Sequence, residues 1–118
     1  MEVKFERRVE KVDGNPKVYL SGPITGYDIE ERKRYFGSIE KGFEMAGFEV
    51  VNPLKKGLPE SAAYEEHIKK DIELLLTCDY IFILPDSDKS KGAKLEQHIA
   101  DVVGITKIEV SLEIKRLW

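Results

Sequence analysis

"YIFILP", residues 80–85, is the stretch that decides the fold. It is apolar throughout, without the alternation of a strand that has one wet face. Such a run is typical of a strand covered on both sides, as in the middle of a parallel sheet. Helical periodicity precedes it from residue 64 to about 77 and follows it over about residues 91–103. We therefore expect a central buried strand with a helix on either side of it in the chain.

Three further segments are short, rich in β-branched or aromatic residues and bounded by turn formers, so they are predicted strands. They are "KVYLSG" from Lys17, "FEVVNP" from Phe48 and "KIEVSLEI" from Lys107. Another helix is expected over residues 29–46, where apolar residues recur three and four apart. The alternating order predicts an α/β fold, a small Rossmann-like (flavodoxin-like) three-layer sandwich with a mainly parallel sheet of four to five strands.

The length of 118 residues suits one domain. We expect it to span residues 17–118, with residues 1–16 as an N-terminal tail or an edge strand. Nineteen basic against 22 acidic residues leave a net charge of −3, which argues against a nucleic acid polymer as partner. The single Cys78 excludes an internal disulfide, and no residues have the spacing of a metal site. No segment predicts a membrane span or a signal peptide, so we expect a cytoplasmic protein.

The first loop at the carboxyl edge of the predicted sheet is "SGPITGYD". Gly22 and Gly26 allow a sharp turn and the close approach of a ligand. The amides of Ile24, Thr25 and Gly26 would lie near a helix N-terminus, where a phosphate or a sugar hydroxyl could bind. A plain strand-to-helix turn is the alternative. The loop is neither GxGxxG nor a Walker P-loop, which argues against dinucleotides and nucleoside triphosphates.

Glu96 is the most pointed candidate in the third predicted helix. At about 100° per residue, the buried sector is defined by Leu95, Ile99, Val102 and Val103, and Glu96 falls near its edge. A carboxylate at that position is partly removed from water. The alternative is a glutamate that favours the helix macrodipole near the first turn.

Asp71 lies at the border of the apolar stripe of the second predicted helix. Two carboxylates on different helices, directed to one end of a sheet, suit glycosyl chemistry, because one attacks the anomeric carbon while the other manages the proton of the leaving group. Tyr19, two residues before the first loop, could reach a carboxylate at the site. Asp86 follows the central strand and could hydrogen-bond a nucleobase. The alternatives are a charge on the flank of the helix for Asp71, a core tyrosine for Tyr19 and a solvated loop for Asp86.

The same residues carry a family resemblance. The stretches "VYLSGPITG", "VVNP", "KDIELLLTCDYIFILP" and "SKGAKLE" resemble the nucleoside 2-deoxyribosyltransferase-like proteins, including their short branch in bacteria and phages. The resemblance covers about residues 17–104. It extends to the related 2'-deoxynucleoside 5'-phosphate N-hydrolases.

The resemblance implies roles for particular residues. It makes Glu96 the nucleophile of a covalent glycosyl-enzyme intermediate, associates Asp71 with the leaving base and matches Tyr19 to the tyrosine of the first strand. Gly22 and the residues Ser90 to Gly92 would hold the sugar or its 5'-phosphate. It also implies a homodimer or a higher homo-oligomer.

Two features depart from the family pattern. Pro23 removes an amide from the first loop, and Thr25 stands where phosphate-using members tend to carry a basic residue. Lysines at positions 89, 91 and 94 could bind phosphate instead.

The leading hypothesis is cleavage or transfer of the N-glycosidic bond of a (deoxy)nucleoside or nucleoside 5'-monophosphate, without a cofactor. Glu96 would attack the anomeric carbon, Asp71 would donate or orient the proton, and Tyr19 would set the geometry of the carboxylate. The alternatives are a non-catalytic nucleotide-binding or sensing module on the same fold, and a plain protein-interaction domain.

Overall fold

The computed structural model describes residues 15–109, which form four strands, three α-helices and two short 3₁₀ turns. In chain order the elements are β1 (Lys17–Ser21), α1 (Ile29–Met45), β2 (Glu49–Val51), η1 (Pro53–Lys55), α2 (Tyr64–Leu75), β3 (Tyr80–Ile83), η2 (Ser87–Lys89), α3 (Lys91–Val103) and β4 (Thr106–Glu109). The predicted alternation of strands and helices is therefore confirmed. Helices α1 and α2 end one and about two residues earlier than predicted.

The four strands form one parallel sheet in the order β2-β1-β3-β4. β3, the stretch that opened the sequence, is an inner strand and pairs with β1 on one side and β4 on the other. In the β1–β3 pair, Tyr19 lies opposite Ile81 and Ser21 opposite Ile83. The chain leaves β1 and β3 toward opposite halves of the sheet, so the carboxyl ends of these two strands form the switch point at which such sheets bind ligands.

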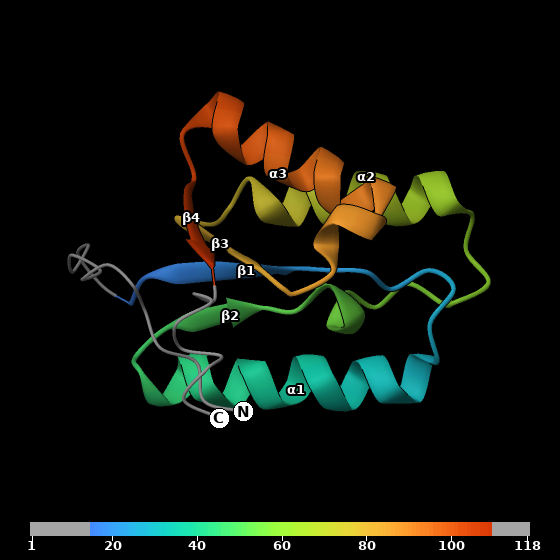
Figure 1. Cartoon of the computed structure of the whole chain (residues 1–118), viewed down its shortest axis with the longest axis horizontal. Coiled ribbons are helices and arrows are strands. Elements are labelled where there is room, and N and C mark those ends of the chain that lie inside the picture. The colour runs from blue at the N-terminus through green and yellow to red at the C-terminus, as the bar shows by residue number, and fades with distance from the viewer. Residues whose placement is uncertain (1–14, 110–118) are drawn as a thin grey trace.

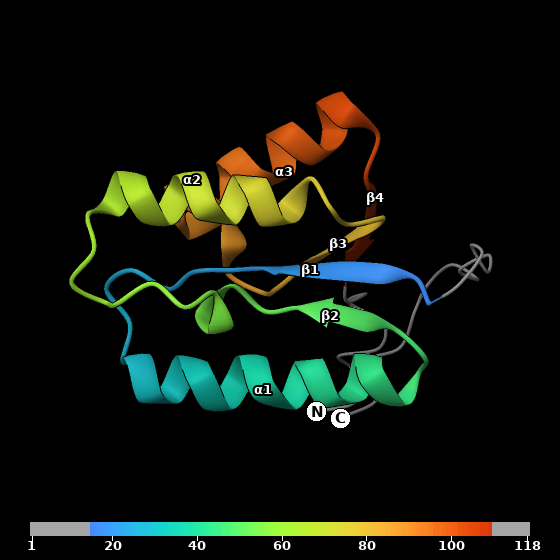
Figure 2. The same cartoon turned by 180° about the vertical axis from the view of Figure 1, so that it is seen from behind.

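The sheet lies between two helical layers (Figures 1 and 2). α1 covers one face, and α2 and α3 lie together on the other. Strand side chains alternate between these faces. On β1, Val18 and Leu20 join Phe36 and Phe43 in the core under α1. Tyr19 points the other way and packs with residues of α2 and α3. The three-layer Rossmann-like fold is thus confirmed.

Two sequence predictions extend beyond the described residues. The edge strand considered for residues 1–16 falls almost entirely on residues 1–14, and the last part of the fourth predicted strand falls on residues 110–114. Both lie outside the described range. Within residues 15–109, no helix is both long and apolar enough to cross a membrane.

Candidate active site

A cleft of about 940 Å³ opens at the carboxyl edge of the sheet. The loop after β1, the segment after β2, the cleft-facing side of α2 and the start of α3 all contribute to its wall. Most of the site residues predicted from the sequence line it: Gly22, Ile24, Thr25, Gly26, Asp71, Ser90, Gly92 and Glu96. Residues from four separate segments thus meet where the topology predicts a ligand site.

Glu96 is 5% exposed and lies among the core-facing residues of α3. The predicted buried sector was wrong, because Leu95, Val102 and Val103 are 40%, 71% and 52% exposed. The face that packs on the sheet instead carries Ala93, Glu96 and Ala100. The small side chains of Ala93 and Ala100 let α3 approach the sheet closely. Glu96 therefore lies in the middle of the buried face, not at its edge.

Two side chains of β1 hold the Glu96 carboxylate. The Tyr19 hydroxyl donates to Oε2 at 2.6 Å, and the Ser21 hydroxyl donates to Oε1 at 2.8 Å. Residues two apart on a strand share a face, so β1 presents both donors toward α3. Each carboxylate oxygen thus accepts one hydrogen bond, and the carboxylate is fixed in one orientation at the base of the cleft.

Burial dominates the acid–base properties of this trio. It raises the pKa of Glu96 to about 7, although the hydrogen bonds from Tyr19 and Ser21 oppose the rise. The pKa of Tyr19 is raised well above its usual value, first by burial and then by the nearby Glu96 carboxylate. Tyr19 consequently stays a protonated donor at neutral pH. Glu96 titrates in the physiological range and can be present as a carboxylate there.

Asp71 is the second buried carboxylate of the cleft, on α2. Asp71, predicted at the border of the apolar stripe of this helix, is 7% exposed, whereas the apolar residues Tyr64 and Leu76 of the same stretch are 50% and 54% exposed. The reason is a partner: the Lys56 ammonium donates to Oδ1 at 2.7 Å. Burial raises the pKa of Asp71, and Lys56 opposes that rise.

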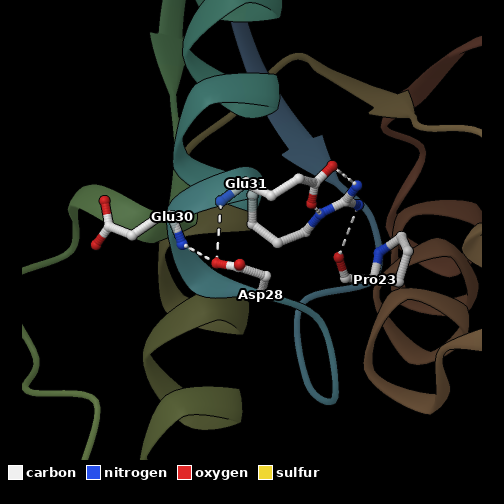
Figure 3. Close-up of polar contacts among 5 residues, drawn as sticks. Pro23, Asp28, Glu30 and Glu31 are labelled. Atoms are coloured by element: carbon white, nitrogen blue, oxygen red, sulfur yellow. Dashed lines mark hydrogen bonds and ion pairs between the residues drawn. The ribbon is translucent and has the colours of Figure 1, made fainter.

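The loop between β1 and α1 is fixed by polar contacts (Figure 3). The Asp28 carboxylate caps α1 by accepting from the amides of Glu30 at 2.9 Å and Glu31 at 3.3 Å. Arg32 donates to the Pro23 carbonyl at 3.3 Å. Asp28 therefore occupies the first amides of α1, whereas the ligand contacts predicted from the sequence are the amides of Ile24, Thr25 and Gly26 in the preceding loop.

The guanidinium of Arg32 is enclosed on several sides. It lies 4.6 Å from the ring centroid of Tyr27 and 5.0 Å from that of Tyr35, and it pairs with the Glu31 carboxylate. These contacts keep a buried charge paired. Arg32 thereby links the first loop rigidly to α1.

Asp86 is the predicted binding residue that the structure places outside the cleft wall. It is exposed, adopts a left-handed conformation with φ of 68° and lies 3.7 Å from the ammonium of Lys89. Ser90, in contrast, borders the cleft and caps α3, since its hydroxyl accepts from the Ala93 amide at 3.2 Å. Among residues 15–109, no three histidine, cysteine, aspartate or glutamate side chains gather into a possible metal site.

A comparison with known protein families shows the family of this chain. A family model described as "Domain of unknown function (DUF4406)" matches residues 16–109. The chain belongs to this family. No curated protein matches the DUF4406 chain significantly.

Among solved structures, a 2-desoxiribosyltransferase from Leishmania mexicana is similar to the DUF4406 chain, with a TM-score of 0.61 and 16% sequence identity. The alignment covers 80% of this chain and 63% of that protein, so the chain spans under two thirds of its length. At this identity the comparison establishes a shared fold. It supports the resemblance noted from the sequence as far as the fold is concerned.

Two residues of the site, Ser21 and Lys56, were not identified as candidates from the sequence. Ser21 could have been found from strand periodicity, since it lies two residues after Tyr19 on the same face. Lys56 gave no signal, because it follows the short turn η1 and comes to Asp71 only through the tertiary fold. The two buried carboxylates, Glu96 and Asp71, thus both have buried side chains as hydrogen-bond donors.

Gly22 is required by close packing. A methyl group at this position would lie 2.9 Å from Cβ of Leu84, which is too close for two carbon atoms that are not bonded to each other. We expect Gly22→Ala to lower the free energy of unfolding by about 1–3 kcal/mol, the usual cost of overpacking. Chemical denaturation would measure it.

Gly37→Ala is the matched control for this change. Gly37 lies within α1, and a methyl group there would meet no atom within 4 Å beyond its chain neighbours and the backbone of its own helix. The control should raise stability by up to about 1 kcal/mol, because alanine favours a helix more than glycine. Equal effects of the two substitutions would contradict the packing argument.

Proposed function

We propose that this protein cleaves or transfers the N-glycosidic bond of a (deoxy)nucleoside or nucleoside 5'-monophosphate through a covalent glycosyl–Glu96 intermediate. The observation that carries the proposal is the Glu96 carboxylate, which lines the cleft while Tyr19 and Ser21 hold both of its oxygens. A carboxylate fixed in this way has one defined direction of attack. The shared fold with a 2-desoxiribosyltransferase adds support.

In the proposed reaction, an oxygen of Glu96 bonds to C1' of the sugar while the bond from C1' to the base nitrogen breaks. The electron pair of that bond passes to the base, which takes up a proton from the Asp71 side of the cleft. Water, or a second base, then attacks C1' and releases Glu96. Tyr19 and Ser21 donate to the carboxylate in the free enzyme and again when it is the leaving group.

The cleft has room for such a substrate. Its volume of about 940 Å³ lies at the upper end of the roughly 300–1,000 Å³ typical of small-molecule sites. Thr25, Ser90 and Gly92 line the cleft and would contact the sugar or its 5'-phosphate. Lys33, Lys89 and Lys91 add positive charge to the same wall. We further propose a cytoplasmic homodimer or larger homo-oligomer, which sedimentation would test.

The direct test is incubation of the protein with nucleosides and their 5'-monophosphates, in ribo and deoxy forms, with and without a second free base. Chromatography would follow the released base, and mass spectrometry of quenched protein would look for a glycosyl adduct on Glu96. Base release with that adduct is the expected result. Tight binding of a nucleotide without release from any compound would favour the non-catalytic binding module.

The activity should depend on pH through Glu96. Because its pKa is about 7, the nucleophilic carboxylate is lost on acidification, and kcat/KM should fall about tenfold per pH unit well below 7. Tyr19→Phe removes a donor that lowers this pKa, so the midpoint should shift to higher pH. A profile of kcat/KM from pH 5 to 9 would measure both. A flat acidic limb for wild type would contradict the role of Glu96.

A further inference from the structure

The ion pair of Lys56 and Asp71 is the second buried polar unit of the cleft. Their side chains are 8% and 10% exposed, and the ammonium lies 2.7 Å from the carboxylate. Both residues line the same cleft as Glu96. Lys56 directly follows η1 and Asp71 lies on α2, so the two partners come from different elements. Both groups influence the pKa of Glu96, Lys56 lowering it and Asp71 raising it.

Within this pair, the proton available for donation is on Lys56. An ammonium has three N–H donors and no acceptor. One donor goes to Oδ1 of Asp71, and because Lys56 borders the cleft, its other donors can be offered to a ligand. Burial raises the pKa of Asp71 above its ordinary 3.8, but the charge-assisted hydrogen bond from Lys56 opposes that rise and favours the ionised carboxylate. An ionised carboxylate has no proton to give.

We infer that Lys56 is the proton donor to the leaving base and that Asp71 is a positioning residue, which orients the ammonium. This inference rests on the proposed function and refines it, because the sequence left Asp71 either to donate or to orient the proton and did not consider Lys56. The ammonium would lie beside the base while the sugar lies over Glu96. Lys56 is therefore a catalytic residue in this assignment.

The reaction balances with Lys56 as acid and then as base. As the C1'–N bond breaks, its electron pair stays on the base, and a proton moves from the Lys56 ammonium to a base nitrogen or carbonyl oxygen. Lys56 is then a neutral amine. When water attacks C1', the C1'–O bond to Glu96 breaks, Glu96 recovers its carboxylate, and the water proton passes to the amine. The sum is nucleoside plus water giving free sugar plus the neutral free base, which carries the transferred proton.

The test compares leaving groups of different acidity in wild type and Lys56→Met. The probes are a graded series of the accepted nucleoside with electron-withdrawing substituents on the base, and the para-nitrophenyl glycoside of the same sugar. A base that is stable as an anion needs no proton. Lys56→Met should therefore lower kcat for the unsubstituted nucleoside by about 10²–10⁴-fold, and by progressively less as the base becomes more acidic.

Two further variants separate chemistry from folding. Lys56→Met leaves Asp71 buried without its partner, which can destabilise the fold. The double variant Lys56→Met with Asp71→Asn removes both charges and should show the same dependence on the leaving group. Asp71→Asn alone keeps the ammonium and should lose less kcat for the unsubstituted nucleoside than Lys56→Met does.

Each outcome decides the inference. A uniform fall across all leaving groups in Lys56→Met and in the double variant would overturn it and leave Lys56 as a structural partner of Asp71. A larger loss of kcat in Asp71→Asn than in Lys56→Met would mean that Asp71, not Lys56, donates the proton. Wild type that releases no leaving group from any probe would instead overturn the proposed function, and this inference with it.

Discussion

Glu96→Gln should lower kcat for base release by more than about 10⁴-fold, the scale on which enzymes lose rate when their nucleophile is removed. The amide has nearly the shape of the carboxylate but cannot form the glycosyl ester. The cleft keeps its form, since the Tyr19 and Ser21 hydroxyls that now donate to Glu96 can each donate or accept. Substrate affinity should therefore change far less than kcat. Single-turnover kinetics and calorimetric titration of the same substrate would measure the two quantities.

Glu73→Gln is the matched control for this substitution. Glu73 is on α2, its side chain is 71% exposed, and its contact is a surface ion pair with Lys70. It should leave kcat unchanged. Turnover by Glu96→Gln within about tenfold of wild type would contradict a covalent mechanism, whose nucleophile should be worth far more.

Much of this fold could be predicted because its local and global signals agree. The unbroken apolar run of residues 80–85 contains the inner strand β3, and Gly47, which follows the first predicted helix, ends α1 with a φ of +92°. Each of these features depends on its own neighbourhood in the chain. A single sequence is sufficient to find such features.

The buried faces of α2 and α3 were harder to predict, for a physical reason. Hydrophobic periodicity assumes that the most apolar side of a helix faces the core. In α3 the core side carries Glu96 between two alanines, while Val102 and Val103 are exposed. In α2, Asp71 is buried because Lys56 balances its charge. Departures of this kind are expected at functional sites, where local rules are broken for the sake of chemistry.

The arrangement also implies that Glu96 lowers the stability of the protein at the pH where it would act. Its pKa is about 7 in the folded protein against an ordinary 4.5. Below pH 4.5 both the folded and unfolded states hold the proton. As the pH rises to 7, the unfolded state ionises first, so the free energy of unfolding decreases until the folded state has also ionised. The shift of about 2.5 pH units corresponds to a loss on the order of 3 kcal/mol by pH 8.

Glu96→Gln should therefore be more stable than wild type at pH 8, by on the order of 3 kcal/mol relative to any difference at pH 4. The variant holds a neutral group at all pH values, so it escapes this loss, and the effects of titrating groups that do not interact with Glu96 cancel in the comparison. Urea unfolding at several pH values would measure it, with Glu73→Gln as the exposed control that should track wild type. A stability difference that stays constant from pH 4 to pH 8 would show that Glu96 ionises as readily in the folded protein as in the unfolded chain. Burial of Glu96 would then not lower the free energy of unfolding, in contrast to what its raised pKa predicts.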